Sequence, residues 1–154
     1  YLDAYASDIP YNSFDRAIPE LSQNCRIAQR PDVFWDRGHK HVIVEIDEDQ
    51  HVDRTCDHTR MSLFAVASRL PTFFIRFNPD AYKAPKQVKL FERLKHLEAV
   101  VRDALDRMPV EGALLSVCRL FFDGYDMVPS WEPYTLEEVT SHLDAYKPRT
   151  LSRP

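Results

Sequence analysis

The chain has 154 residues, of which 44% are hydrophobic, so it is long enough to bury the core of one domain. Its net charge of −4 does not indicate a nucleic-acid-binding protein, although a local basic cleft is compatible with it. No segment resembles a signal peptide or a membrane span, and the odd, widely spaced cysteines (Cys25, Cys56 and Cys118) argue against a disulfide framework. We therefore expect an intracellular protein, nuclear or cytoplasmic, that does not bind membranes. Because Tyr1 is not an initiator methionine, we expect the sequence to be a fragment or a trimmed chain.

The first half of the chain predicts a loop followed by a β-hairpin. Residues 1–30 carry aromatic residues, prolines and polar clusters, which indicate a loop with one short helix near residues 13–24. Two short apolar segments follow, residues 32–36 and 41–47. The turn between them is centred on Gly38, because glycine tolerates the positive φ that tight turns require.

Three carboxylates lie at the ends of these two strands. A hairpin centred on Gly38 pairs residues whose numbers sum to 77, so Asp32 and Glu45 lie opposite each other with Cβ atoms roughly 5 Å apart. The period of two along a strand places Glu45 and Asp47 on the same face. Carboxylates this close repel each other unless a cation lies between them, and oxygen ligands favour Mg²⁺ or Mn²⁺. The sequence therefore predicts a metal site formed by Asp32, Glu45 and Asp47.

A βαβ unit follows the hairpin. Apolar residues recur at helical spacing between residues 53 and 70, and Pro71 ends that helix. Residues 72–77 form a strongly apolar strand that ends at a turn. A strand, a helix and a second strand in this order predict that strand 72–77 runs parallel to strand 41–47.

The last third of the chain predicts two helices and one strand. Residues 86–107 have the clearest helical period, and residues 113–122 favour a strand. A final helix covers residues 136–146, with Thr135 as N-cap and Glu138 three residues later. We expect residues 83–154 either to complete the fold or to bind substrate.

Several polar residues near the predicted carboxylate site are candidates for function. His51 follows the second strand and suits a general base or a proton donor, although a histidine at a helix entry often only forms hydrogen bonds. Asp57 and Arg60 share one helix face and could contribute to the site or form an ion pair with each other. Arg76 could clamp a phosphate, or it could be an internal partner of Glu45 or Asp57.

Together these segments resemble a known family of nucleases. The order and spacing of the run RPDVFW…VIVEIDEDQH…D..R…FFIRFNPDAY are similar to the PD-(D/E)xK superfamily. Within it, the chain resembles the Vsr-like group, which includes very-short-patch mismatch endonucleases and EDxHD homing endonucleases. The ending IRFNPDAY is also similar to predicted nucleases of large DNA viruses and protists. The resemblance covers residues 30–82.

The resemblance implies roles for individual residues. Asp32 corresponds to the metal-bridging aspartate of the first strand, and Glu45 to the acidic residue of the second. His51 corresponds to the histidine of the Vsr-like motif and Asp57 to its last aspartate. The early glutamate of the group comes from an N-terminal helix, for which Glu20 is the candidate.

One position departs from the general superfamily pattern. Asp47 stands where most members carry a lysine that orients the attacking water. The Vsr-like branch also lacks this lysine and is thought to use its histidine instead, so the departure favours that branch. The resemblance implies an α/β fold with a restriction-endonuclease-like mixed sheet, made of a hairpin plus a βαβ unit and flanked by helices. We expect a single nuclease-like domain over residues 1–154.

The expected function is that of a Mg²⁺-dependent or Mn²⁺-dependent endonuclease that hydrolyses phosphodiester bonds of DNA with a metal-activated water. Arg60, Arg76 and Lys83 are the expected substrate-binding residues, and the basic residues of segment 83–107 either line the path of the nucleic-acid backbone or face solvent. Two alternatives remain open. The chain could be a catalytically inactive module that keeps the nuclease fold and binds nucleic acid, as RAP-like domains are thought to do. It could also bind a protein partner, and the oligomeric state is left open.

Overall fold

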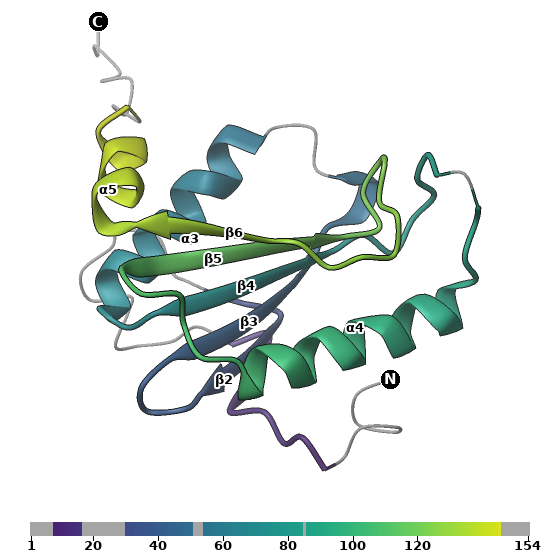
Figure 1. Ribbon diagram of the computed structural model, residues 1–154, viewed down its shortest axis with the longest axis horizontal. Helices are drawn as coiled ribbons and strands as arrows, with labels where there is room; N and C mark the ends of the chain where they lie inside the picture. Colours follow the sequence, from purple (N-terminus) through teal and green to yellow (C-terminus); the bar gives the residue numbers. More distant parts are fainter. Residues whose placement is uncertain (1–7, 17–29, 51–53, 85, 146–154) are drawn as a thin grey trace, which may run out of the picture.

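The structure is a computed structural model, and it describes residues 8–16, 30–50, 54–84 and 86–145 (Figure 1). The described residues form one six-stranded mixed sheet with three α-helices and a short 3₁₀ helix. In chain order the elements are β1 (Ser13–Phe14), β2 (Val33–Asp36), β3 (His41–Ile46), η1 (Glu48–Gln50), α3 (Arg54–Ser68), β4 (Thr72–Phe77), α4 (Leu90–Asp106), β5 (Ala113–Leu120), β6 (Trp131–Thr135) and α5 (Leu136–Ala145). The predicted α/β class is confirmed. Within the described ranges, no helix has the length and apolar character needed to cross a membrane.

The strands follow one another across the sheet in the order β1 to β6. The first three strands are antiparallel, β3, β4 and β5 are parallel, and β6 is antiparallel to β5. In the hairpin, Val33 pairs with Val44 and Asp36 with His41, so paired residues sum to 77 as predicted. The predicted parallel pairing of β3 with β4 is also confirmed.

The tight connection between β2 and β3 depends on local chemistry. Gly38 has a φ of +75°, a conformation that residues with a Cβ rarely adopt. Its backbone N–H donates to the carboxylate of Asp36 at 2.7 Å, which closes the turn. Because the turn is fixed in this way, the register of the whole hairpin is fixed with it.

Helices cover both faces of the sheet. In Figure 1, α4 runs along one face, and α3 and α5 lie together on the opposite face. Alternate residues of the strands supply the two cores. The α4 side includes Val42, Val44, Phe73, Ile75, Phe77, Leu97, Val101 and Leu120, and the α3 side includes Phe34, Ile43, Met61, Phe64, Phe74, Leu115, Val117 and Val139. A residue on a strand therefore belongs either to the α4 side or to the α3 side.

Segment 83–154 contributes β5 and β6 to the same sheet, so it completes the fold. The capping box of the last helix is confirmed: the Glu138 carboxylate accepts a hydrogen bond from the Thr135 backbone N–H at 2.7 Å, and Thr135 Oγ1 accepts one from the Glu138 N–H at 3.3 Å. The clearest predicted helix begins at Leu90, four residues later than expected. Residues 13–14 form a strand where a helix was expected, and the rest of that predicted helix lies largely outside the described residues.

Candidate functional site

A polar pocket opens on the α3 side of the sheet, where β3 and β4 end. Its volume is about 180 Å³. Most of its lining is charged, and the lining residues are Arg30, Asp32, Glu45, Ile46, Asp47, Arg60, Met61, Phe74 and Arg76. The three carboxylates of the predicted metal site therefore line one pocket, together with both arginines that were singled out from the sequence.

Asp32 and Glu45 lie on neighbouring strands at this pocket. Asp32 directly precedes β2, and extension of the observed register by one residue places it opposite Glu45. The Asp32 carboxylate accepts a hydrogen bond from the backbone N–H of Ile46 at 2.7 Å, which holds it beside β3. The two carboxylates are thus brought together by the hairpin, as the sequence predicted.

Glu45 is a largely buried acid of the pocket. Its side chain is 14% exposed, and its Oε1 accepts a hydrogen bond from Arg60 Nη2 at 3.0 Å. Burial raises the pKa of Glu45 to about 8, with the carboxylates of Asp32 and Asp47 adding to the effect and the two arginines opposing it. A cation at this carboxylate would compete with the proton that burial favours.

Asp47 and Arg76 form a buried ion pair. The guanidinium donates two hydrogen bonds of 2.6 Å to the two carboxylate oxygens, and both side chains are 6% exposed. Arg76 lies on the α3 side, opposite Glu45 in the parallel register. Its carboxylate partner in this pair is Asp47, whereas Glu45 and Asp57 were the partners considered from the sequence. Because the pair is bidentate and buried, it fixes the ends of β3 and β4 relative to each other.

Two further arginines lie at the open side of the pocket. Arg60 also donates to the backbone carbonyl of Arg30 at 2.8 Å, and its side chain is 41% exposed. Arg30 is 57% exposed and contacts Asp15 at 3.2 Å. Sequence reasoning did not assign a role to Arg30, although its position directly before Pro31 and Asp32 was a signal that could have found it. These two cationic side chains can reach an anion that enters the pocket.

The donor set of the pocket suits a hard divalent cation. Asp32 and Glu45 offer oxygen ligands, whereas Asp47 is held by Arg76. Among the described residues, no group of three or more histidine, cysteine or acidic side chains is placed to hold a metal ion. Two carboxylates are compatible with Mg²⁺, which usually keeps several waters and binds one or two carboxylates plus substrate phosphates. His51 and Glu20 lie outside the described residues, as does the side chain of Asp57.

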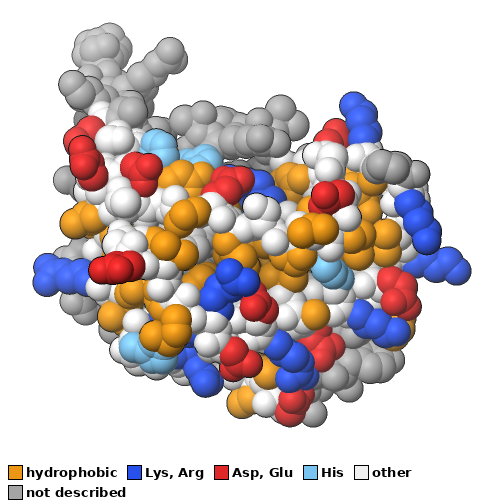
Figure 2. Space-filling view, in the orientation of Figure 1, with side chains coloured by type: hydrophobic (Ala, Val, Ile, Leu, Met, Phe, Trp, Pro, Cys, Tyr) orange, Lys and Arg blue, Asp and Glu red, His pale blue; other side chains and the backbone are white. Residues whose placement is uncertain are grey.

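The basic residues of segment 83–107 lie elsewhere. Lys83 is 93% exposed, contacts Asp123 at 3.8 Å and does not line the pocket. Arg93 is buried and donates hydrogen bonds to the backbone carbonyls of Pro79 and Asp80, so it secures the loop after β4. Helix α4 covers the face of the sheet opposite the pocket, and Figure 2 shows charged side chains of both signs mixed over that face. Lys83 and Arg93 therefore do not line the pocket itself, and a backbone path along segment 83–107 stays a prediction.

Comparisons with known proteins do not add to this picture. No family model matches the chain, and neither does any curated protein or solved structure. The case for a function therefore depends on the residues of the pocket and on their chemistry.

Proposed function

We propose that the chain is a metal-dependent nuclease that hydrolyses phosphodiester bonds of DNA. The observation that carries the proposal is the pocket itself, which is lined by the neighbouring carboxylates of Asp32 and Glu45 and by the arginines Arg30 and Arg60. The two carboxylates could bind a divalent cation, and the two arginines could bind a phosphate group.

Asp32 and Glu45 would hold Mg²⁺ or Mn²⁺. When bound, such an ion lowers the pKa of a water molecule and neutralises charge on the phosphate. Arg60 and Arg30 would bind the non-bridging phosphate oxygens and orient the scissile bond. The Asp47–Arg76 pair would act as a positioning pair, because it keeps the ends of β3 and β4 together.

The arrangement of elements supports the same proposal. A hairpin is followed by a crossover helix and a parallel strand, which is the arrangement that the resemblance to PD-(D/E)xK nucleases implies. We propose on this basis that the sheet is restriction-endonuclease-like. The same resemblance assigns the role of proton transfer to His51, which follows η1 in the sequence.

A specific observation favours one rival. Glu45 is paired with Arg60 and Asp47 with Arg76, so internal ion pairs already partly balance the carboxylates without a cation. A module that has lost catalysis and binds nucleic acid or a protein partner would keep such pairs. The cleavage test below distinguishes the two functions.

The test is cleavage of supercoiled plasmid with Mg²⁺ or Mn²⁺ by wild type, Asp32→Ala and Glu45→Gln. Arg102→Gln is the control, because Arg102 lies on α4 and pairs with Asp8 and Glu98 away from the pocket. We expect wild type and the control to nick or linearise the plasmid only with metal, and both pocket variants to lose this activity. Absence of cleavage by wild type on plasmid, single strands, branched DNA and RNA would overturn the proposal and favour the binding module.

A further inference from the structure

A second polar cluster lies beside the pocket on the same face of the sheet. The parallel registers place Glu45 of β3 opposite Arg76 of β4, and Arg76 opposite Arg119 of β5. These three charged side chains form a row across the strands on the α3 side. Since neighbouring strands are about 4.8 Å apart, Arg119 lies about 10 Å from Glu45 along this row.

Arg119 is held by two neighbours in a half-buried setting. Its Nη1 donates to Glu132 Oε2 at 2.8 Å, and its Nη2 donates to His58 Nε2 at 3.2 Å. The Arg119 side chain is 16% exposed, whereas that of Glu132 is 53% exposed. Tyr134 donates its hydroxyl to the same Glu132 oxygen at 2.9 Å. The carboxylate therefore covers the guanidinium from the solvent side.

His58 lies in an excess of positive charge. Because a guanidinium only donates, His58 Nε2 accepts, and the ring proton resides on Nδ1, which is buried with no hydrogen-bond partner among the described residues. The His142 ring lies 5.4 Å away, between centroids. Burial lowers the pKa of His58, and so do the positive charges of Arg119, His142 and Arg76, with Glu132 acting in the opposite direction.

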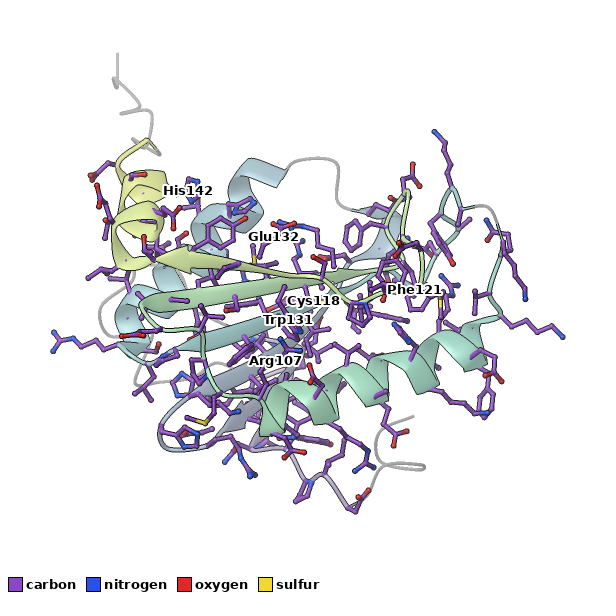
Figure 3. All side chains as sticks on the ribbon, in the orientation of Figure 1. Arg107, Cys118, Phe121, Trp131, Glu132 and His142 are labelled. Carbon is purple, nitrogen blue, oxygen red and sulfur yellow. The ribbon has the colours of Figure 1, made fainter. Side chains whose placement is uncertain are left out.

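The cluster lies at one edge of the molecule. Figure 3 shows Glu132 and His142 on the side of the sheet that carries α3 and α5, with Trp131 and Arg107 on the side of α4. Figure 2 shows histidine side chains beside acidic and basic ones over α5 and β6. The exposed carboxylate of Glu132 is paired with Arg119, and it is the group that a stronger anion would displace.

We propose that Arg119, whose guanidinium is held in place by His58, forms a phosphate-binding subsite for the nucleic-acid strand, next to the carboxylate pocket. The inference rests on the proposed function, because the row that ends at Arg119 starts at Glu45. A distance of about 10 Å corresponds to about one to two nucleotides along a strand, because successive phosphates of one strand lie further apart than their rise of about 3.4 Å along the helix axis. The subsite therefore takes a phosphate that flanks the scissile one. In the free protein Arg119 forms an ion pair with Glu132, and on binding the phosphate replaces the Glu132 carboxylate.

Two substitutions of opposite expected sign test the subsite. The probe is a fluorescein-labelled 12-nucleotide DNA, in duplex and single-stranded form, with binding measured by fluorescence polarisation in EDTA. Arg119→Gln should weaken binding five- to tenfold, and the slope of log K against log salt should become smaller by about one. Glu132→Gln should strengthen binding about threefold, because it removes the carboxylate that competes with phosphate. Arg102→Gln is the matched control, because Arg102 of α4 also has two carboxylate partners, Asp8 and Glu98, and it should leave binding unchanged.

The readouts separate a binding role from a structural one. A merely structural Arg119 would not change the salt slope, and Glu132 is exposed enough for its variant to fold even if Arg119→Gln does not. The subsite is overturned if Glu132→Gln fails to strengthen binding. It is also overturned if Arg119→Gln changes binding no more than Arg102→Gln does, or if polyglutamate of equal charge competes as well as DNA, which would assign the surface to an acidic protein.

Failure of the subsite and failure of the nuclease can be told apart. If wild type binds DNA, the Arg119 and Glu132 substitutions have these effects, and no cleavage occurs, the subsite is supported and the nuclease proposal is contradicted. If cleavage depends on metal and neither substitution changes the affinity for DNA, the nuclease proposal is supported and the subsite is contradicted.

Discussion

Replacement of Glu45 by glutamine should change how stability depends on pH. The ordinary pKa of a glutamate is 4.5, so below this pH the Glu45 carboxyl group is protonated in both the folded and the unfolded chain. Between pH 4.5 and about 8 the unfolded chain releases this proton while the folded protein retains it, because burial raises the pKa of Glu45 to about 8. The stability that Glu45 supports at low pH is therefore lost as the pH rises through this range.

The magnitude follows from the two pKa values. One pKa unit corresponds to about 1.4 kcal/mol, so the full loss between 4.5 and about 8 is about 5 kcal/mol. At pH 7 about two thirds of it, or roughly 3 kcal/mol, has been lost. Glutamine keeps the shape and an acceptor for Arg60 but does not titrate, so Glu45→Gln should become the more stable protein as the pH rises.

The assay is urea unfolding of both proteins in EDTA at pH 5, 7 and 9, with Glu92→Gln on the exposed side of α4 as a control for surface carboxylates. We expect the stability difference between Glu45→Gln and wild type to grow by several kcal/mol from pH 5 to pH 9, and the control to follow wild type. Parallel curves for Glu45→Gln and wild type would refute the burial of a proton-retaining carboxyl group at this position.

Two further predictions concern the packing around the site. Arg76→Met should destabilise the fold by about 3–5 kcal/mol in urea unfolding, because it leaves the Asp47 carboxylate buried without its bidentate partner. The double variant Asp47→Asn with Arg76→Met should recover part of this loss. Equal losses in the single and double variants would contradict the pairing. Thr135→Ala should cost about 1 kcal/mol through loss of the α5 capping box, and thermal unfolding should show no further loss when Glu138→Ala is added, whereas additive losses would count against a reciprocal cap.

The sequence predicts the elements around the pocket well, because their signals are local. The hairpin register follows from the turn at Gly38, and strand 72–77 was predicted with the bounds that β4 has. The edge strands were missed for physical reasons. β1 is two residues long, too short to show alternation, and β6 contains Pro133, which argues against a strand unless it lies at a sheet edge.

The partners within the site could not be predicted, because they depend on how separate elements are placed against each other. Strand periodicity places Arg76 on the face opposite Phe73 and Phe77, but only the stagger of β3 against β4 shows that its guanidinium reaches Asp47. The contact of His58 with Arg119 depends in the same way on how α3 lies over β5. Neither contact can be predicted from the periodicity of the sequence.

The most direct test of the proposed metal site is titration of Mn²⁺ in the absence of nucleic acid, followed by electron paramagnetic resonance, with wild type, Asp32→Ala, Glu45→Gln and Arg102→Gln. We expect wild type and Arg102→Gln to bind Mn²⁺ at one site, more tightly at pH 8.5 than at pH 6 because the cation competes with the proton on Glu45. Both pocket variants should lose this binding. Binding that survives in both variants, or no binding by wild type at either pH, would contradict the assignment of Asp32 and Glu45 as metal ligands.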